Sequence, residues 1–472
     1  MSLSQHKRER LGAFLGELPV ASALKLFAAL ETDRDQGGKN IPHDAILDDL
    51  RRQLAERGAF PSRQPTAKRT FFTPFEDFFV SVRTGPKRRA QIARTSLDPI
   101  WRFMMTDPAL TEAAMAAASL DDAYQSGGDP KPLERAMFIA AEAGLSRMSA
   151  RARESEELRE TLASTLGGKA ALSDMDEIRY LMAGVEALRS LRVVVPSHSP
   201  SLSEEQYYDL RTLFLSVYEQ SAALGAYLLL ALKGRLESPW RALGVYYHLA
   251  GSADERLAGA RETVMALPES LFEDIETLAR KLERAGAEPL DTQTAQARLN
   301  WFAEYADGLA RQAARAGDNV FVNRVEACRD IAGEAHARFV EQALTAMRAA
   351  LPVRHAGASS RLVSPRPDFS KAIAPVVVDD ARRAVKLLVA APADARRLGA
   401  DPGLCDRVLE DASNHARVYA NDLVAEIRAA EGAERAAARR LLEQTVSIIE
   451  PLLQADELGL IIDRAAAAAV TV

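Results

Sequence analysis

The sequence predicts an all-α protein, a multi-helix bundle or an irregular helical solenoid with no sizeable sheet. Capping residues followed by proline, which mark helix starts, recur along the chain. The only runs of β-branched residues, 193–195 and 376–378, are too short to imply a sheet. Apolar residues recur with the helical period, as they do at Ala23, Leu26, Phe27 and Leu30.

The first hundred residues predict a helical hairpin followed by a short aromatic helix. The hairpin covers 4–58, and 59–68 is an irregular connector with two prolines. At 73–76, Thr-Pro-Phe-Glu predicts a helix start in which Thr73 is the cap and Pro74 the first helical residue. The same signal recurs at Asp98-Pro99, Asp107-Pro108 and Ser238-Pro239.

The remainder of the chain predicts a succession of helices separated by two irregular segments, 193–200 and 353–376. Helices are expected at 133–166, 173–192, 203–236, 239–250, 253–266, 268–285, 291–316, 319–351, 377–393, 401–430 and 432–467. We divide the chain into a basic N-terminal helical section (1–102), a helical region (103–192), a central helical body (203–352), a linker or long loop (353–376) and a C-terminal helical unit (377–472).

Composition is that of a globular protein, with 47% hydrophobic and 27% charged residues. Residues 1–102 carry 18 Lys and Arg against 12 Asp and Glu, a net charge of +6. Because the whole chain has a net charge of −6, residues 103–472 carry −12. We expect the basic part to dock on the acidic remainder or on an anionic partner. Only 11 of the 60 basic residues are lysine, which is typical of a GC-rich bacterial genome and makes arginine abundance poor grounds for predicting nucleic-acid binding.

The sequence favours a cytoplasmic location. Cys328 and Cys405 form no CxxC pair, as is usual in a reducing compartment. The N-terminus leads into no apolar signal core. The most apolar stretch, 222–232, is shorter than the roughly 20 residues that span a bilayer, so we interpret it as a buried helix.

The most distinctive feature is the Phe/basic segment, residues 68–94. Five of the 16 phenylalanines fall within nine residues, with basic residues on either side and a tryptophan shortly after. Our preferred interpretation is a core wedge, because large aromatic side chains dominate core energetics. Alternatives are a partner-binding surface, a membrane-docking surface and a nucleic-acid surface. The candidate binding residues are Phe71, Phe72, Phe75, Phe78, Phe79, Lys87, Arg88, Arg89 and Trp101.

Motifs for phosphate or metal binding are incomplete. The Gly-Gly-Lys triplets at 37–39 and 167–169 lack the earlier glycine and the final Ser or Thr of a P-loop. The turn at 33–44 places three aspartates at EF-hand positions but has Gly37 and Asn40 where a ligand and a hydrophobe belong. We therefore expect no metal and no cofactor.

Signals for catalysis are also weak. Asp411 and His415 are four residues apart, which predicts a local pair on one helix. Acidic neighbours should raise the pKa of the Cys328 thiol and leave it unreactive. No nucleophile motif occurs, so whether the protein is an enzyme stays open.

The function we expect is that of a cytosolic helical interaction or scaffold protein without catalysis. Its expected partner is another protein or a second copy of the chain. A peripheral membrane adaptor that uses the Phe/basic segment is one alternative, and an enzyme with its active site in a helical cavity is another. Nucleic acid is disfavoured because the basic cluster is small and no recognisable binding module surrounds it.

Overall fold

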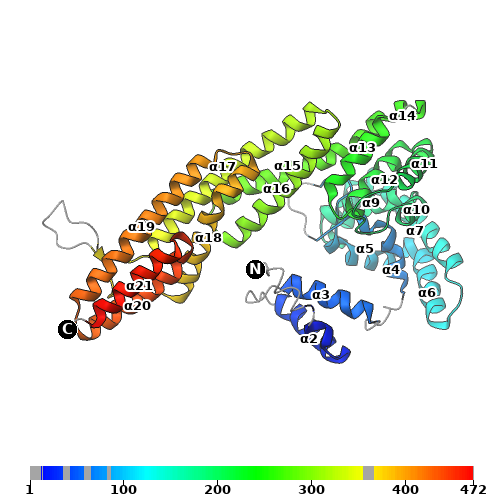
Figure 1. Ribbon diagram of the computed structural model, residues 1–472. Helices are drawn as coiled ribbons and strands as arrows, with labels where there is room; N and C mark the ends of the chain where they lie inside the picture. Colours follow the sequence, from blue (N-terminus) through cyan, green and yellow to red (C-terminus); the bar gives the residue numbers. More distant parts are fainter. Residues whose placement is uncertain are drawn as a thin grey trace. The chain divides into compact units, whose positions relative to one another are not determined.

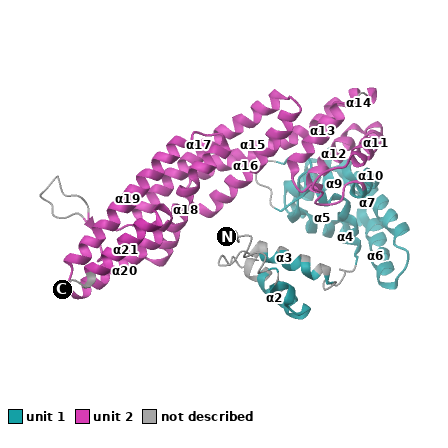
Figure 2. Ribbon diagram, in the orientation of Figure 1, with its two compact units in different colours: residues 1–193 teal, residues 194–472 magenta. Residues whose placement is uncertain are grey.

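The computed structural model describes residues 12, 14–35, 43–57, 65–81, 87–252, 254–354, 366–370 and 372–470, and it is all-α (Figure 1). The predicted fold class is confirmed. In the described residues the only strands are four strands of two residues each, which form one parallel pair and one antiparallel pair. The chain divides into two compact units, 1–193 and 194–472 (Figure 2).

Unit 1 begins with a helical hairpin, and its later helices pack around the phenylalanines of the Phe/basic segment. The hairpin core is leucine-rich and includes Leu30, Leu47 and Leu50. The turn of the hairpin, with most of the EF-hand-like stretch, lies outside the described residues. The elements are α2 (Val20–Asp35), α3 (His43–Glu56), α4 (Ala67–Phe72), η1 (Thr73–Phe78), β1 (Phe79–Val80), β2 (Ile92–Ala93), α5 (Arg94–Thr106), η2 (Pro108–Leu110), α6 (Thr111–Ser126), α7 (Lys131–Glu154), α8 (Glu156–Thr165), α9 (Lys169–Met182) and α10 (Val185–Val194).

Two helix starts in unit 1 differ from the prediction. The chain is already helical before Thr73, because the Thr66 side chain caps α4 by accepting from the Arg69 N–H at 3.3 Å. The Thr73 hydroxyl instead donates to the Arg69 carbonyl. Likewise α5 begins at Arg94 and carries Pro99 in its interior. The buried Asp174 carboxylate accepts from the Ser96 hydroxyl and so holds the first turn of α5 ahead of the proline.

Unit 2 is built on long helices that lie side by side (Figure 1). Helix α17 packs on α15, α16 and α18, and α18 packs on α19. The elements are α11 (Glu204–Gln220), α12 (Ala222–Arg235), η3 (Pro239–Arg241), α13 (Ala242–Ala250), α14 (Glu255–Gly259), α15 (Arg261–Ala287), α16 (Thr292–Arg315), α17 (Asn319–Ala349), β3 (Val353–Arg354), β4 (Arg366–Pro367), α18 (Pro375–Leu398), α19 (Pro402–Ala429), α20 (Gly432–Ile449), η4 (Glu450–Leu452) and α21 (Ala455–Val470).

The predicted linker at 353–376 lies within unit 2, whose helices α17 and α18 pack directly on one another. Strands β3 and β4 pair at its two ends. Arg354 and Arg366 both donate to the Glu426 carboxylate on α19, at 2.6 and 3.3 Å. Residues 355–365 lie outside the described residues, and the division of the chain into five sections stays a prediction.

No helix in the described part of the chain combines the length and the apolar character needed to cross a bilayer.

His336, on α17, is a buried histidine that should make stability pH-dependent. It is 1% exposed, and its Nε2 has no hydrogen-bond partner in the described part of the chain. Burial lowers its pKa, and the nearby Asp394 only partly opposes this. The unfolded chain, with an ordinary histidine pKa of about 6.5, therefore binds more protons than the folded chain below neutral pH.

We expect the stability of unit 2 to fall as the pH drops through about 6.5 towards the folded pKa of His336. The variant His336→Leu should show a shallower fall over the same range, because it removes the titrating group. Urea unfolding midpoints between pH 8 and pH 5 measure the difference. Comparison with the wild type cancels His415, whose pKa is also lowered by burial. Parallel pH profiles for the two proteins would contradict this assignment.

Candidate functional site

Four of the five clustered phenylalanines lie in the core of unit 1. Phe71 and Phe75 are fully buried, Phe78 is 1% exposed and Phe72 is 6% exposed. The Phe71 ring stacks on Phe138 of α7, with ring centroids 5.6 Å apart. These positions agree with the core interpretation.

The other two aromatic candidates, Phe79 and Trp101, are half-buried. The Trp101 ring centroid lies 5.8 Å from that of Phe71, at the edge of the same cluster. Participation of the cluster in binding stays a prediction.

The basic side of the segment is anchored within unit 1 by an ion-pair network. Lys87 Nζ donates to Asp174 Oδ1 at 2.6 Å, to a Glu177 carboxylate oxygen and to the Gln91 carbonyl. The Asp174 side chain is fully buried and that of Glu177 is 6% exposed. Lys87 is therefore committed to internal partners on α9.

The same network fixes the backbone around Lys87. Ala90 has a φ of 59°, a left-handed conformation that is unusual outside glycine, and its N–H donates to Glu177 Oε1 at 2.7 Å. Of the remaining basic candidates, Arg88 is half-buried and Arg89 is exposed. The carboxylates of Asp174 and Glu177 therefore hold the backbone around Lys87 in place.

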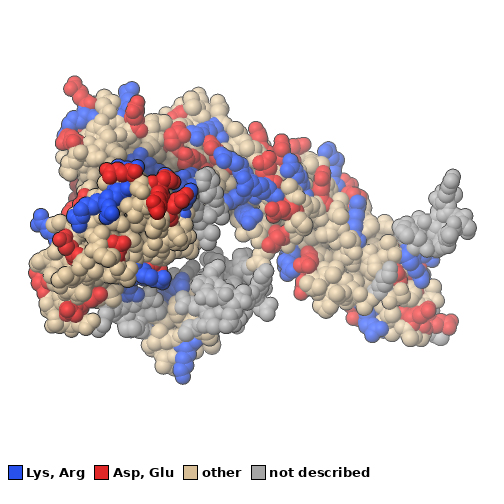
Figure 3. All heavy atoms as spheres, turned by 180° about the vertical axis from the view of Figure 1, so that it is seen from behind, with Lys and Arg blue, Asp and Glu red and all other residues tan. Residues whose placement is uncertain are grey.

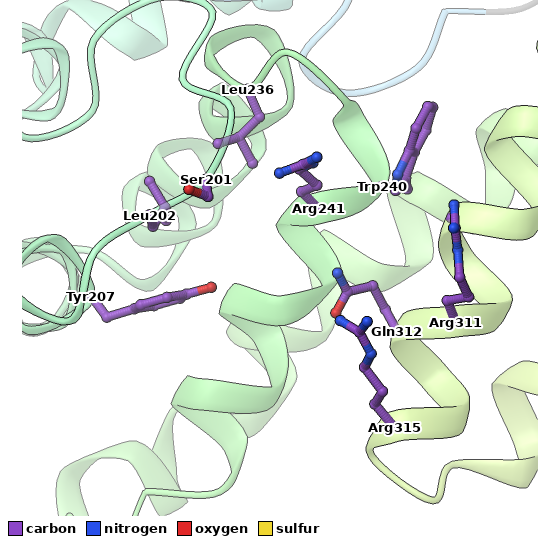
Figure 4. A pocket seen from close by; sticks show the side chains of 10 residues that line it. Ser201, Leu202, Tyr207, Leu236, Trp240, Arg241, Arg311, Gln312 and Arg315 are labelled. Carbon is purple, nitrogen blue, oxygen red and sulfur yellow. The ribbon is translucent and has the colours of Figure 1, made fainter.

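Unit 2 contains a cavity of about 350 Å³ that none of the sequence motifs predicts (Figure 4). Three separate parts of the chain form it: the start of α11, the turn between α12 and α13, and the C-terminal end of α16. The lining residues are Ser201, Leu202, Tyr207, Leu236, Trp240, Arg241, Gly308, Arg311, Gln312 and Arg315. We call it the arginine pocket.

Close packing between η3 and α16 holds one wall of the arginine pocket. A Cβ at Gly308 would overlap the Trp240 indole, so the glycine lets this ring lie against α16. The Trp240 ring also contacts Tyr305 edge-on, with centroids 5.5 Å apart, and Trp301 at 5.9 Å. Arg241, the next residue, is thereby placed at the pocket, where its guanidinium donates to the Pro200 carbonyl.

The arginine pocket is strongly cationic. In the described residues no carboxylate forms an ion pair with Arg241, Arg311 or Arg315. Asp307, one turn before Arg311, pairs with Arg329 instead, at 2.5 Å. The carbonyl end of α16 offsets part of the Arg315 charge. The three arginines that line the cavity nevertheless carry like charges, and a bound anion would relieve their mutual repulsion.

Neutral hydrogen-bonding groups also line the arginine pocket. In the described part of the chain, neither the Tyr207 hydroxyl nor the Gln312 side chain has a hydrogen-bond partner. Burial raises the pKa of Tyr207, so its hydroxyl stays protonated at neutral pH. The Tyr207 ring is steadied by His248, whose ring centroid lies 4.8 Å away. Figure 4 shows the Tyr207 hydroxyl and the Gln312 side chain both directed into the space between the elements.

Sequence reasoning missed the arginine pocket because its residues are far apart in the chain. The one local signal is the Arg311–Arg315 spacing, which places two like charges on the same helix face. Such a pair is mildly destabilising without an anion. In a chain with 49 arginines, that signal does not stand out.

The catalytic candidates from the sequence are held in structural roles. Asp411 bonds to Arg348 at 2.7 Å instead of pairing with His415. Burial raises the pKa of the Cys328 thiol to about 11, with Glu276 adding to the effect, so the direction agrees with the prediction while the main cause differs. In the described residues no group of three or more His, Cys, Asp or Glu side chains is arranged to hold a metal ion.

Basic and acidic side chains are interspersed on the face shown in Figure 3, and neither sign covers it alone. The lining of the arginine pocket, in contrast, contains three arginines and no acidic residue. Comparison of the chain with protein-family models, with curated proteins and with solved structures gives no match.

Proposed function

We propose that the protein is a helical interaction or scaffold protein, without catalysis, that recognises an anionic group of its partner or ligand in the arginine pocket. The observation that carries the proposal is the convergence of Arg241, Arg311 and Arg315 on one cavity without a carboxylate partner among the described residues. Guanidinium groups bind carboxylates and phosphates through paired hydrogen bonds, so this is a surface suited to anions.

The chemistry of the lining favours binding over catalysis. None of the lining residues is Asp, Glu or His, so Ser201, which could otherwise act as a nucleophile, has no general base among the residues that line the pocket. Tyr207 is a weak acid whose pKa is raised further by burial, so it serves as a hydrogen-bonding group. An enzyme with a helical active-site cavity is therefore the less favoured alternative.

A peripheral membrane adaptor that uses the Phe/basic segment is also less favoured. Membrane docking needs exposed aromatic and basic side chains. Phe71, Phe75 and Phe78 are buried, and Lys87 is paired with two carboxylates. Membrane docking through these side chains would require them to leave the core and their ion pairs, whereas binding at the arginine pocket would not.

The proposal is tested by titrating the 472-residue chain with a panel of anions: inorganic phosphate, citrate and an acidic peptide. We expect at least one to bind, and the double variant Arg311→Gln/Arg315→Gln to bind it about 10- to 100-fold more weakly, because charge-assisted hydrogen bonds are lost. Binding should also weaken as salt is raised. Isothermal titration calorimetry gives the affinities.

The matched control is Arg298→Gln. Arg298 is an exposed arginine on the same helix, α16, and it does not line the arginine pocket. It should leave affinity unchanged. If none of the anions binds, or if Arg298→Gln weakens binding as much as the double variant does, the arginine pocket is not the anion site.

A further inference from the structure

We infer that the ligand of the arginine pocket is a phosphate monoester of a small hydroxyl-rich molecule, the chemical class of sugar phosphates. This inference rests on the proposed function, because it names the ligand of the same pocket. Charge, size and the neutral hydrogen-bonding groups of the lining each contribute to it.

Charge favours phosphate over carboxylate. Three arginines line the cavity, and a carboxylate group brings only one negative charge. A phosphate monoester carries about −1.5 to −2 at neutral pH and three acceptor oxygens, so it can engage more than one arginine at once. The planar donor fork of arginine matches this geometry.

Size requires more than the phosphate group. The cavity of about 350 Å³ lies near the lower end of the roughly 300–1,000 Å³ typical of small-molecule sites. A single water needs only about 10–15 Å³ measured in this way, so a five-atom phosphate leaves much of the space empty. An organic body attached to the phosphate would fill the remainder.

The neutral lining indicates what that body is. Ser201 and Tyr207 offer hydroxyls and Gln312 an amide, and each of these groups can both donate and accept a hydrogen bond. Hydroxyl groups on the ligand have the same dual character. A purely aromatic or aliphatic body would desolvate these side chains without giving them partners, which costs affinity.

Gly244 on α13 can be used to test how far the organic part of the ligand extends. A Cβ at this position would lie 3.3 Å from the Tyr207 hydroxyl and 3.6 Å from Gln312 Oε1. Alanine favours the helix, but the 3.3 Å contact is tighter than usual, so the Tyr207 hydroxyl must shift by a few tenths of an ångström. The added methyl group then occupies space beside both polar atoms. A ligand that bonds to both atoms should be hindered, whereas a phosphate held by the arginines should not.

The experiment compares ribose 5-phosphate, inorganic phosphate, citrate, free ribose and a phosphoserine peptide by calorimetric titration of the 472-residue chain. We expect ribose 5-phosphate to bind about tenfold or more tightly than inorganic phosphate, and free ribose not to bind measurably. Tyr207→Phe, which keeps the ring against His248, should weaken ribose 5-phosphate binding about fivefold to tenfold. Gly244→Ala should weaken it similarly, and neither variant should change the affinity for inorganic phosphate.

The outcomes separate this inference from the proposed function. Equal affinity for ribose 5-phosphate and inorganic phosphate, or tighter binding of citrate or of the phosphoserine peptide, would overturn the ligand class and leave the anion site in place. Unchanged ribose 5-phosphate binding in both Tyr207→Phe and Gly244→Ala would also overturn it. Failure of every anion to bind would remove both.

Discussion

Replacing Lys87 with methionine is expected to lower the free energy of unfolding of unit 1 by about 3–5 kcal/mol, the usual cost of removing one partner of a buried ion pair. Methionine keeps the apolar stem but removes the ammonium group that pairs with Asp174, which is fully buried, and with Glu177. Desolvated carboxylates that lose their counter-charge are destabilising beyond the loss of the hydrogen bonds themselves. Urea unfolding, with hydrogen exchange of the α9 amides to localise the effect, measures the change.

Lys68→Met is the matched control for this prediction. Lys68 also pairs with an aspartate, Asp98, but that side chain is 73% exposed, so the pair should contribute only about 0–1 kcal/mol. Charge counting in the sequence suggests the same small value for every basic residue of the Phe/basic segment. Because Asp174 is buried, we expect Lys87→Met to lower the free energy of unfolding more than Lys68→Met does. Equal destabilisation by the two variants would contradict that reasoning.

Phe75→Ala should cost a similar amount, about 3–5 kcal/mol, because the ring is fully buried and a truncated phenylalanine leaves a cavity that neighbours fill only partly. The ring lies edge-on to Phe71 and to Phe138, at centroid distances of 6.1 and 6.5 Å, so both would lose contacts. Differential scanning calorimetry of the full chain should show the transition of unit 1 shifted to lower temperature.

Phe14→Ala provides the comparison, since Phe14 is 58% exposed and its truncation should change stability little. Loss of a binding activity in Phe75→Ala, with an unchanged melting transition, would instead support the surface interpretation of the Phe/basic segment. The two outcomes therefore distinguish a core wedge from a docking surface.

Helix ends were predictable from the sequence where a capping residue coincides with a change of periodicity. Helices α16 and α17 begin within a residue of the predicted starts, because Asp291 and Asp318 each accept a hydrogen bond from the backbone N–H three residues ahead. Apolar periodicity alone was less informative. It continues through Ser155 and Ser221, where the structure ends one helix and caps the next.

The sequence prediction also placed a helix boundary where the structure has none. The prediction ended one helix at 266 and began the next at 268, but Pro268 lies buried inside α15, which runs unbroken from Arg261 to Ala287. The loss of one backbone hydrogen bond there is outweighed by packing of α15 against α12 and α17. Tertiary contacts of this kind leave no local trace in the sequence.

The arginine pocket illustrates the same limit for function. Tyr207, Arg241 and Arg311 come from elements separated by tens of residues, and their convergence depends on how α11, η3 and α16 pack. The Phe/basic segment was conspicuous because its residues are contiguous, yet most of its aromatic rings serve the core. Local density of unusual residues therefore indicated a structural element in this chain, and the best candidate site has no contiguous motif.

The joining of Arg354 and Arg366 by Glu426 has a consequence for engineering. These contacts, with the β3–β4 pair, hold Arg354 and Arg366 beside α19 and so fix the separation of the two chain ends that an insert between them would have to join. Closing a longer loop costs only about 0.6 kcal/mol for each doubling of its length. We therefore expect a reporter domain or an affinity tag inserted between Arg354 and Arg366 to leave α17 and α18 in register.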